Sequence, residues 1–175
     1  MNLPSTSFPM RADAAKREPA LQEHITASLY KWQEANNKGD LFVLHDGPPY
    51  ANGSLHIGHF LNKVMKDIIV RYNVMKGRKV SFIPGWDCHG LPIELKALEK
   101  LSQAERKALH PLELRQRARN IAEAAIADQR ASFQRWGVMA DWDNAYLTMD
   151  PAYEAAQLRV FAEMLERGNI FRGLR

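Results

Sequence analysis

The sequence predicts an α/β fold in which parallel strands are joined by a crossover helix. A short apolar run at residues 41–44 and the segment 79–84, which contains Val80, Phe82 and Ile83, are predicted to be strands, and the segment 55–75 between them has helical periodicity. The first run, Leu-Phe-Val-Leu, shows no polar–apolar alternation, which is typical of a parallel strand covered on both faces. This strand–helix–strand order forms a βαβ unit, so both strands should end at the same edge of the sheet.

The helix between these strands should pack against the sheet through one apolar face. Its apolar residues recur at three- and four-residue steps, and they are Ile57, Leu61, Val64, Ile68, Tyr72 and Met75. Lys63 and Lys66 fall away from this face, which favours a solvated position for both ammonium groups. Gly77 follows the last apolar residue and is placed to end the helix.

Further elements surround this unit. An extended arm over residues 1–11 should precede a helix over 19–36 with an inner face of Leu21, Ile25, Leu29 and Trp32. Helices are also predicted over 92–101, 111–136 and 151–168, and a strand over 170–175. The inner face of the 111–136 helix should consist of Leu114, Ala118, Ile121, Ala125, Gln129, Phe133 and Trp136.

The composition is that of an ordinary globular protein. Hydrophobic residues make up 46% of the 175 residues and charged residues 25%. The net charge of +4, from 24 basic and 20 acidic residues, permits a nucleic-acid partner without indicating one. Cys88 is the only cysteine, so an intrachain disulfide is impossible, and we expect a cytoplasmic protein. The sequence contains neither a signal peptide nor an apolar run of membrane-spanning length.

Two loops follow the predicted strands, and both should lie at the carboxyl edge of the sheet. Open α/β sheets bind ligands in a crevice at that edge. The loop 45–54 is stiffened and punctuated by Gly47, Pro48, Pro49, Asn52 and Gly53, whereas the loop 85–92 carries Asp87. We therefore expect the polar clusters His56/His59 and Asp87/Cys88/His89 to be neighbours.

His56 and His59 lie three residues apart in the first helical turn, so they share a face. The free N–H groups and the positive dipole end of that turn attract anions. Gly53 and Gly58 let a phosphate approach the backbone without a Cβ in the way. Two imidazole donors at this place suit a triphosphate whose charge shifts during attack at the α-phosphorus.

Alternatives remain open for both clusters. His56, His59, Cys88 and His89 are ligand types that zinc accepts, although one thiol among three imidazoles is unusual for a structural zinc site. Asp87 is a loop carboxylate suited to ligand binding, but it could instead cap a helix that begins near Leu91. Cys88 is better explained as a small buried residue than as a nucleophile, because no separate base is identifiable.

The segment PYANGSLHIGH, Pro49 to His59, resembles the signature of class I aminoacyl-tRNA synthetases. Together with DGPP before it and PGWDCHGLPIE, Pro84 to Glu94, it is similar to the isoleucyl-tRNA synthetase family within that class. The resemblance implies the first half of a Rossmann-like nucleotide-binding domain at 41–175, preceded by the arm and helix at 1–40. Family members are longer, so we expect a fragment that lacks the editing insertion, the second catalytic half and the anticodon-binding domain, and that is inactive alone.

The resemblance also implies the activity. It implies ATP-dependent activation of L-isoleucine and transfer to tRNA(Ile), with Mg²⁺ accompanying ATP, no zinc in this segment and a monomeric full-length enzyme. His56 and His59 would be catalytic, while Pro48 and Asp87 would bind isoleucine. The ATP and adenylate set would be Gly47, Pro49, Tyr50, Ala51, Asn52, Gly53, His56, Gly58 and His59. The alternatives are a valyl or leucyl enzyme, a zinc-dependent hydrolase, and a nucleotide-binding module without catalysis.

Overall fold

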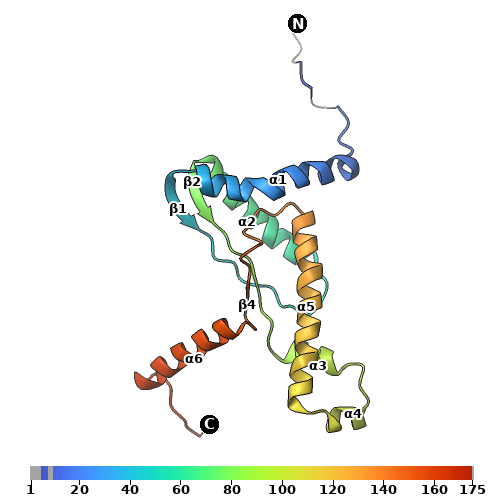
Figure 1. Cartoon of the computed structure of the whole chain (residues 1–175), viewed down its shortest axis with the longest axis vertical. Helices are drawn as coiled ribbons and strands as arrows, with labels where there is room; N and C mark the ends of the chain where they lie inside the picture. The colour runs from blue at the N-terminus through green and yellow to red at the C-terminus, as the bar shows by residue number, and fades with distance from the viewer. Residues whose placement is uncertain (1–4, 8–9, 175) are drawn as a thin grey trace.

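A computed structural model describes residues 5–7 and 10–174. Residues 1–4 and 8–9 of the predicted arm, and Arg175, lie outside the described residues. Helix α1 (Ala14–Asn36) crosses one end of the molecule, and α5 (Pro111–Arg135) runs along its length (Figure 1). Helix α1 therefore begins five residues before the predicted start.

The sheet confirms the predicted parallel pairing. Strand β1 (Gly39–Val43) pairs with β2 (Arg78–Ser81), and α2 (Ile57–Met75) is the crossover between them. After Pro84 the chain changes partner, and β3 (Gly85–Trp86) pairs in parallel with β4 (Tyr146–Leu147). The predicted strand 79–84 is thus divided into two short strands with different neighbours. Gly77 ends α2 with a φ of 77°, as predicted.

The predicted inner face of α2 is wrong. Ile57, Ile68 and Met75 are 79%, 61% and 80% exposed, whereas Lys63 is buried. The predicted solvated position of Lys63 and Lys66 is therefore wrong as well, because both ammonium groups pair with the buried carboxylate of Asp46. Periodicity located the apolar stripe correctly but did not show that this ion pair turns the opposite face inward.

Strand β1 is not covered on both faces as predicted, since Leu41 and Val43 are each 62% exposed. The predicted inner face of α1 is wrong except for Leu29, which packs against the core, because α1 docks through Tyr30 and Gln33 while Leu21, Ile25 and Trp32 stay exposed. The Gln33 amide donates to the Val80 carbonyl oxygen and accepts from the Val80 N–H, both at 2.9 Å. This helix therefore attaches to the backbone of β2 through polar groups.

The core lies where α5 meets the β3–β4 ladder. Trp86, Phe133 and Trp142 pack with ring centroids 6.4 Å apart in each pair. The bounds of α5 match the prediction to within one residue, and Gln129 and Phe133 of its predicted inner face are buried, whereas the buried Ala122 and Ile126 were not part of that face. Packing against this helix positions α3 (Leu91–Leu98) beside the second loop.

Two predictions about the remaining elements are wrong. The sequence reasoning missed α4 (Gln103–Ala108), although Ser102 and Glu105 form the capping box that marks such a helix start. Residues 170–174 form no strand. Helix α6 (Pro151–Glu166) agrees with its prediction, extends away from the other elements and buries none of its residues (Figure 1).

Candidate functional site

The two predicted loops meet through backbone hydrogen bonds. The Ala51 N–H donates to the Asp87 carbonyl oxygen at 2.8 Å, and the Asp87 N–H donates to the Pro49 carbonyl oxygen at 2.9 Å. These bonds make a parallel bridge between Tyr50 and Asp87. Both loops therefore lie at the same edge of the sheet, as the βαβ order predicted.

His56 and His59 cap the first turn of α2. The Gly58 N–H donates to Nδ1 of His56 at 3.1 Å, and the His56 N–H donates to Nδ1 of His59 at 3.2 Å. A ring nitrogen that accepts a hydrogen bond carries no proton, so the proton of each neutral imidazole lies on Nε2. The caps therefore leave two Nε2–H groups as donors beside the helix N-terminus.

The two imidazole rings lie close together. Their centroids are 4.0 Å apart, so two positive charges would repel each other strongly. Burial, the neighbouring His56 and the Lys63 ammonium lower the pKa of His59. A Cβ on Gly58 would come within 2.9 Å of Cε1 of His56, so glycine at this position is needed for the His56 cap itself.

A buried ion-pair cluster ties the first loop to α2. The Asp46 side chain is fully buried and accepts from Nζ of Lys63 and, at 2.6 Å, from Nζ of Lys66. The Asp46 carbonyl oxygen also accepts from the Tyr146 hydroxyl at 3.2 Å. No role was predicted for Asp46, although its place between a strand end and Gly-Pro-Pro was a usable signal for an anchor.

The predicted loop residues differ in exposure. Ala51 is fully buried, Pro48, Pro49, Asn52 and Gly53 are half-buried, and Gly47 and Tyr50 are exposed. Open space surrounds the position that a Cβ of Gly47 would occupy, and at Gly53 that position lies 3.8 Å from Nζ of Lys96. Sterics alone therefore do not demand glycine at either position.

In the second loop, Asp87 does not cap the following helix. Its Oδ1 accepts from the His89 N–H at 3.2 Å, whereas Gly90 stands at the N-cap of α3. The helix-cap alternative for Asp87 is therefore wrong. The half-buried carboxylate of Asp87 stays in the loop, on the residue that forms the backbone bridge with Tyr50.

Cys88 is a buried structural residue. Its N–H donates to the Thr148 hydroxyl at 2.8 Å, and burial raises the pKa of its thiol. Nε2 of His89 lies 2.7 Å from the Thr148 carbonyl oxygen. Within residues 5–7 and 10–174, no group of three or more His, Cys, Asp or Glu side chains is close enough to hold a metal ion. The alternative zinc cluster is therefore not assembled.

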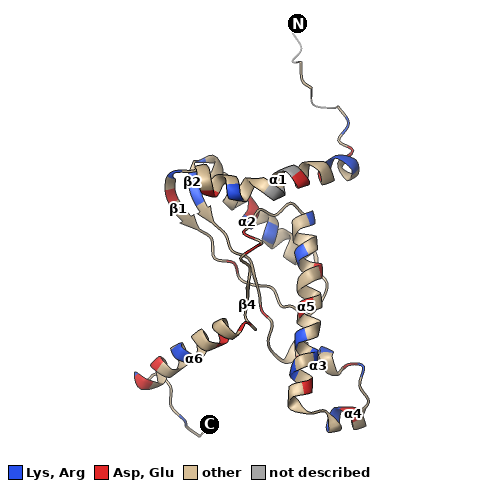
Figure 2. Cartoon of the chain, viewed as in Figure 1, with Lys and Arg blue, Asp and Glu red and all other residues tan. Residues whose placement is uncertain are grey.

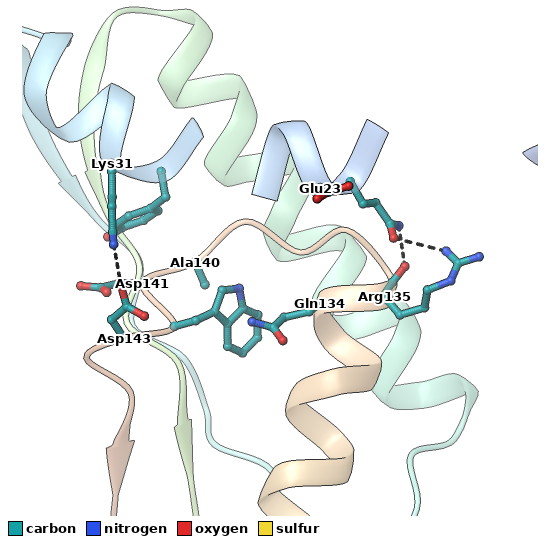
Figure 3. A pocket seen from close by; sticks show the side chains of 10 residues that line it. Glu23, Lys31, Gln134, Arg135, Ala140, Asp141 and Asp143 are labelled. Atoms are coloured by element: carbon teal, nitrogen blue, oxygen red, sulfur yellow. Dashed lines mark hydrogen bonds and ion pairs between the residues drawn. The ribbon is translucent and has the colours of Figure 1, made fainter. Parts of the chain in front are cut away.

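Two of the cavities in the described part of the chain border the core, and neither is lined by His56 or His59. A cavity of about 800 Å³ lies between α3, α5 and the start of α6, and Cys88, His89 and Ile93 line part of it. A second, of about 500 Å³, lies between α1 and the end of α5, where Lys31 and Asp143 form an ion pair at 2.8 Å (Figure 3). The histidine pair instead stands on an open surface.

Residues of both charges occur along α5 and α6 (Figure 2). On α5, Arg119 pairs with Glu123 and Arg135 pairs with Glu18. None of the helices in the described part of the chain is both long and apolar enough to cross a membrane.

This arrangement of a capped histidine turn and a bridged second loop belongs to a known class. The family model described as tRNA synthetases class I (I, L, M and V) matches residues 20–175. The chain therefore belongs to the class I tRNA synthetase family. The predicted Rossmann-like nucleotide-binding fold is confirmed.

Curated relatives of this chain are named isoleucine–tRNA ligases. The chain is 58% identical to the one from Nostoc sp. and 56% identical to the one from Thermosynechococcus vestitus, over 100% of this chain in both cases. It spans only 18% of the length of each. Among solved structures, a LeuRS of Agrobacterium radiobacter K84 in a ternary complex with tRNA and LeuAMS aligns with a TM-score of 0.70 and 28% identity. That alignment covers 93% of this chain and 19% of the LeuRS.

Proposed function

We propose that this chain forms the ATP- and isoleucine-binding part of an isoleucine–tRNA ligase. The observation that carries the proposal is the Tyr50–Asp87 bridge between the two loops, which is followed along the chain by the histidine-capped N-terminus of α2. Identity of 58% to isoleucine–tRNA ligases over the whole chain supports isoleucine over valine or leucine. The domain division at residue 40, the cytoplasmic location and the monomeric state of the full-length enzyme are parts of the same proposal.

The reaction would need no protein nucleophile. The isoleucine carboxylate attacks the α-phosphorus of ATP, the bond to the β-phosphate oxygen breaks, and pyrophosphate leaves with its Mg²⁺. A hydroxyl of the tRNA end then attacks the adenylate carbonyl and displaces AMP. The protein contributes positioning and electrostatic stabilisation.

The histidine pair is suited to that stabilisation. Because each Nδ1 is occupied by a backbone N–H, each Nε2–H can donate to a phosphate oxygen without a change of tautomer. These imidazole donors, assisted by the positive end of the α2 dipole, would stabilise the charge that develops on the α-phosphate. The loop from Gly47 to Gly53 would form the nucleotide cradle, comprising Gly47, Pro49, Tyr50, Ala51, Asn52 and Gly53.

The amino-acid subsite would lie beside the bridge. Asp87 would pair with the α-ammonium group of isoleucine through a charge-assisted hydrogen bond. Pro48 would form a rigid wall for the aliphatic side chain, because a ring with fixed φ relaxes little around a smaller substrate. One methylene separates isoleucine from valine, a difference that hydrophobic pockets discriminate weakly, as is known for this enzyme family.

Calorimetric titration of the 175-residue chain tests the proposal. The ligands are ATP and the non-hydrolysable sulfamoyl analogues of isoleucyl-, valyl- and leucyl-adenylate. We expect the isoleucyl analogue to bind most tightly and to shift the NMR signals of His59 and Asp87. Equal affinity for the three analogues would contradict isoleucine specificity, and a failure of all ligands to bind would contradict the nucleotide site.

Two substitutions separate the proposed roles in a ligase that carries this segment. His59→Ala should slow adenylate formation by roughly 10²–10³-fold with the isoleucine KM nearly unchanged, because a transition-state donor is lost. Asp87→Ala should mainly raise the isoleucine KM. Pre-steady-state adenylate formation at varied ATP and isoleucine distinguishes the two. If His59→Ala instead weakened isoleucine binding at an unchanged chemical rate, the role of His59 would be wrong.

A further inference from the structure

Gln129 on α5 touches both loops of the site through one buried amide. The side chain is only 1% exposed. Its Nε2 donates to the carbonyl oxygens of Tyr50 at 3.1 Å and Gly53 at 2.7 Å. Its Oε1 accepts from Nε1 of Trp86 at 3.0 Å. One side chain therefore holds the first loop at two points and the residue before Asp87 at a third.

These contacts orient the backbone of the first loop. Nζ of Lys96 on α3 also donates to the Asn52 carbonyl oxygen, at 2.6 Å. The C=O and N–H of a trans peptide unit point in opposite directions. Holding the carbonyls of Asn52 and Gly53 against α3 and α5 thus turns the N–H groups of Gly53 and Ser54 away from these helices.

Packing alone does not account for an amide at this position. An apolar side chain of similar size would fill the space, whereas a buried amide is unfavourable unless its polar atoms are paired. Both Nε2 hydrogens and Oε1 of Gln129 have partners, so the amide is well satisfied where it lies. Those partners are the two loops that carry the candidate nucleotide and amino-acid subsites.

We propose that Gln129 is a positioning residue for the ATP site. It directs the N–H groups of Gly53 and Ser54 toward the triphosphate and holds Trp86, and with it Asp87, in register with the first loop. Gln129 itself does not touch the substrate. This inference rests on the proposed function, because the loop is taken to be the nucleotide cradle.

Two substitutions separate the contacts of the amide. Gln129→Leu removes all three hydrogen bonds, whereas Gln129→Glu keeps an acceptor for the Trp86 indole and removes both donors to the first loop. The matched controls are Gln116→Leu and Gln116→Glu, at an exposed position of the same helix. Ile126→Val, which removes core volume from the same helix, controls for lost stability.

The measurements are amide hydrogen exchange at Ala51 and Asp87, the two donors of the bridge, and the affinity for ATP. Both Gln129 variants should accelerate exchange at Ala51 by roughly tenfold or more, because the Tyr50 and Gly53 carbonyls lose their buried donor. ATP affinity should fall by a similar factor. The indole N–H signal of Trp86 should move much more in Gln129→Leu than in Gln129→Glu.

The outcomes are distinguishable from failure of the proposed function. If Gln129→Leu leaves exchange and ATP affinity within twofold of Gln116→Leu, the inference is overturned. It is also overturned if exchange accelerates while ATP affinity stays unchanged, or if Ile126→Val reproduces both effects. If the unaltered chain binds no ATP while hydrogen exchange at Ala51 still accelerates in the Gln129 variants, the proposed function is wrong. The conclusion that Gln129 orients the first loop is then still supported.

Discussion

The buried cluster of Asp46, Lys63 and Lys66 allows a quantitative prediction about the first loop. In Asp46→Ala, Nζ of Lys63 loses its carboxylate partner while its side chain remains only 4% exposed. Removing one partner of a buried ion pair typically costs about 3–5 kcal/mol. Because small proteins have only about 5–15 kcal/mol of stability, this one substitution should remove a large part of it.

The protonation state of Lys63 sets an upper limit to that cost. Burial already lowers the pKa of Lys63, with Asp46 as the main opposing influence. Neutralising an unperturbed lysine at pH 7 spans roughly 3.4 pH units at about 1.4 kcal/mol each, or about 5 kcal/mol. If the ammonium can instead reach water, the loss will be smaller. We therefore expect a loss of about 3–5 kcal/mol for Asp46→Ala.

Urea denaturation followed by the fluorescence of the core residues Trp86 and Trp142 measures this loss. The double variant Asp46→Ala/Lys63→Met should recover much of the stability, because it removes the unpaired charge as well as its partner. Asp143→Ala, which breaks the exposed pair with Lys31, should change stability little. A loss below about 1 kcal/mol for Asp46→Ala, or no recovery in the double variant, would refute the reasoning.

Three further predictions concern other parts of the chain. Gly85→Ala should cost at least about 1–3 kcal/mol in urea denaturation, since its Cβ would overlap the Tyr146 ring, whereas Gly173→Ala should be silent. Because the pKa of His59 is lowered in the folded state, the stabilising effect of its neutral imidazole should be fully present above the unfolded pKa near 6.5 and lost as the pH falls through the folded pKa. His59→Asn, which keeps an acceptor, should flatten this dependence of stability on pH. An unchanged pH profile of stability would contradict the prediction. The exposed stripe of α2 should make the chain self-associate; light scattering should show a smaller mass for Ile68→Lys, and a monomer at high concentration would count against this.

The parallel βαβ unit was predictable because it depends on local patterns. The apolar runs, the Gly/Pro loop and the terminating Gly77 each leave a signature over a few residues. The placement of both loops at one edge then followed from topology alone. The histidine pair was likewise recognisable from its spacing at a helix start.

The buried face of each helix was not predictable, because it depends on contacts with residues far away in the chain. The predicted stripe of α2 is apolar and yet exposed. The opposite, polar side of the helix faces inward, where Lys63 pairs with the carboxylate of Asp46, 17 residues upstream. Gln129 was placed correctly on the inner face of α5, but its partners lie 76 and 79 residues away. A sequence pattern shows which residues share a face of a helix. Which of those faces is buried depends on the elements that pack against the helix in the tertiary structure.

Buried polar side chains here replace the hydrogen bonds that a wider sheet would supply. Each described sheet has only two strands, so many backbone groups next to them lack a ladder partner. Gln33 satisfies both backbone groups of Val80, and Gln129 satisfies the carbonyls of Tyr50 and Gly53. An unpaired buried carbonyl or N–H is destabilising, and each amide removes two such penalties at once. The same side chains therefore stabilise the fold and fix the loop geometry, so a substitution that weakens one should weaken the other.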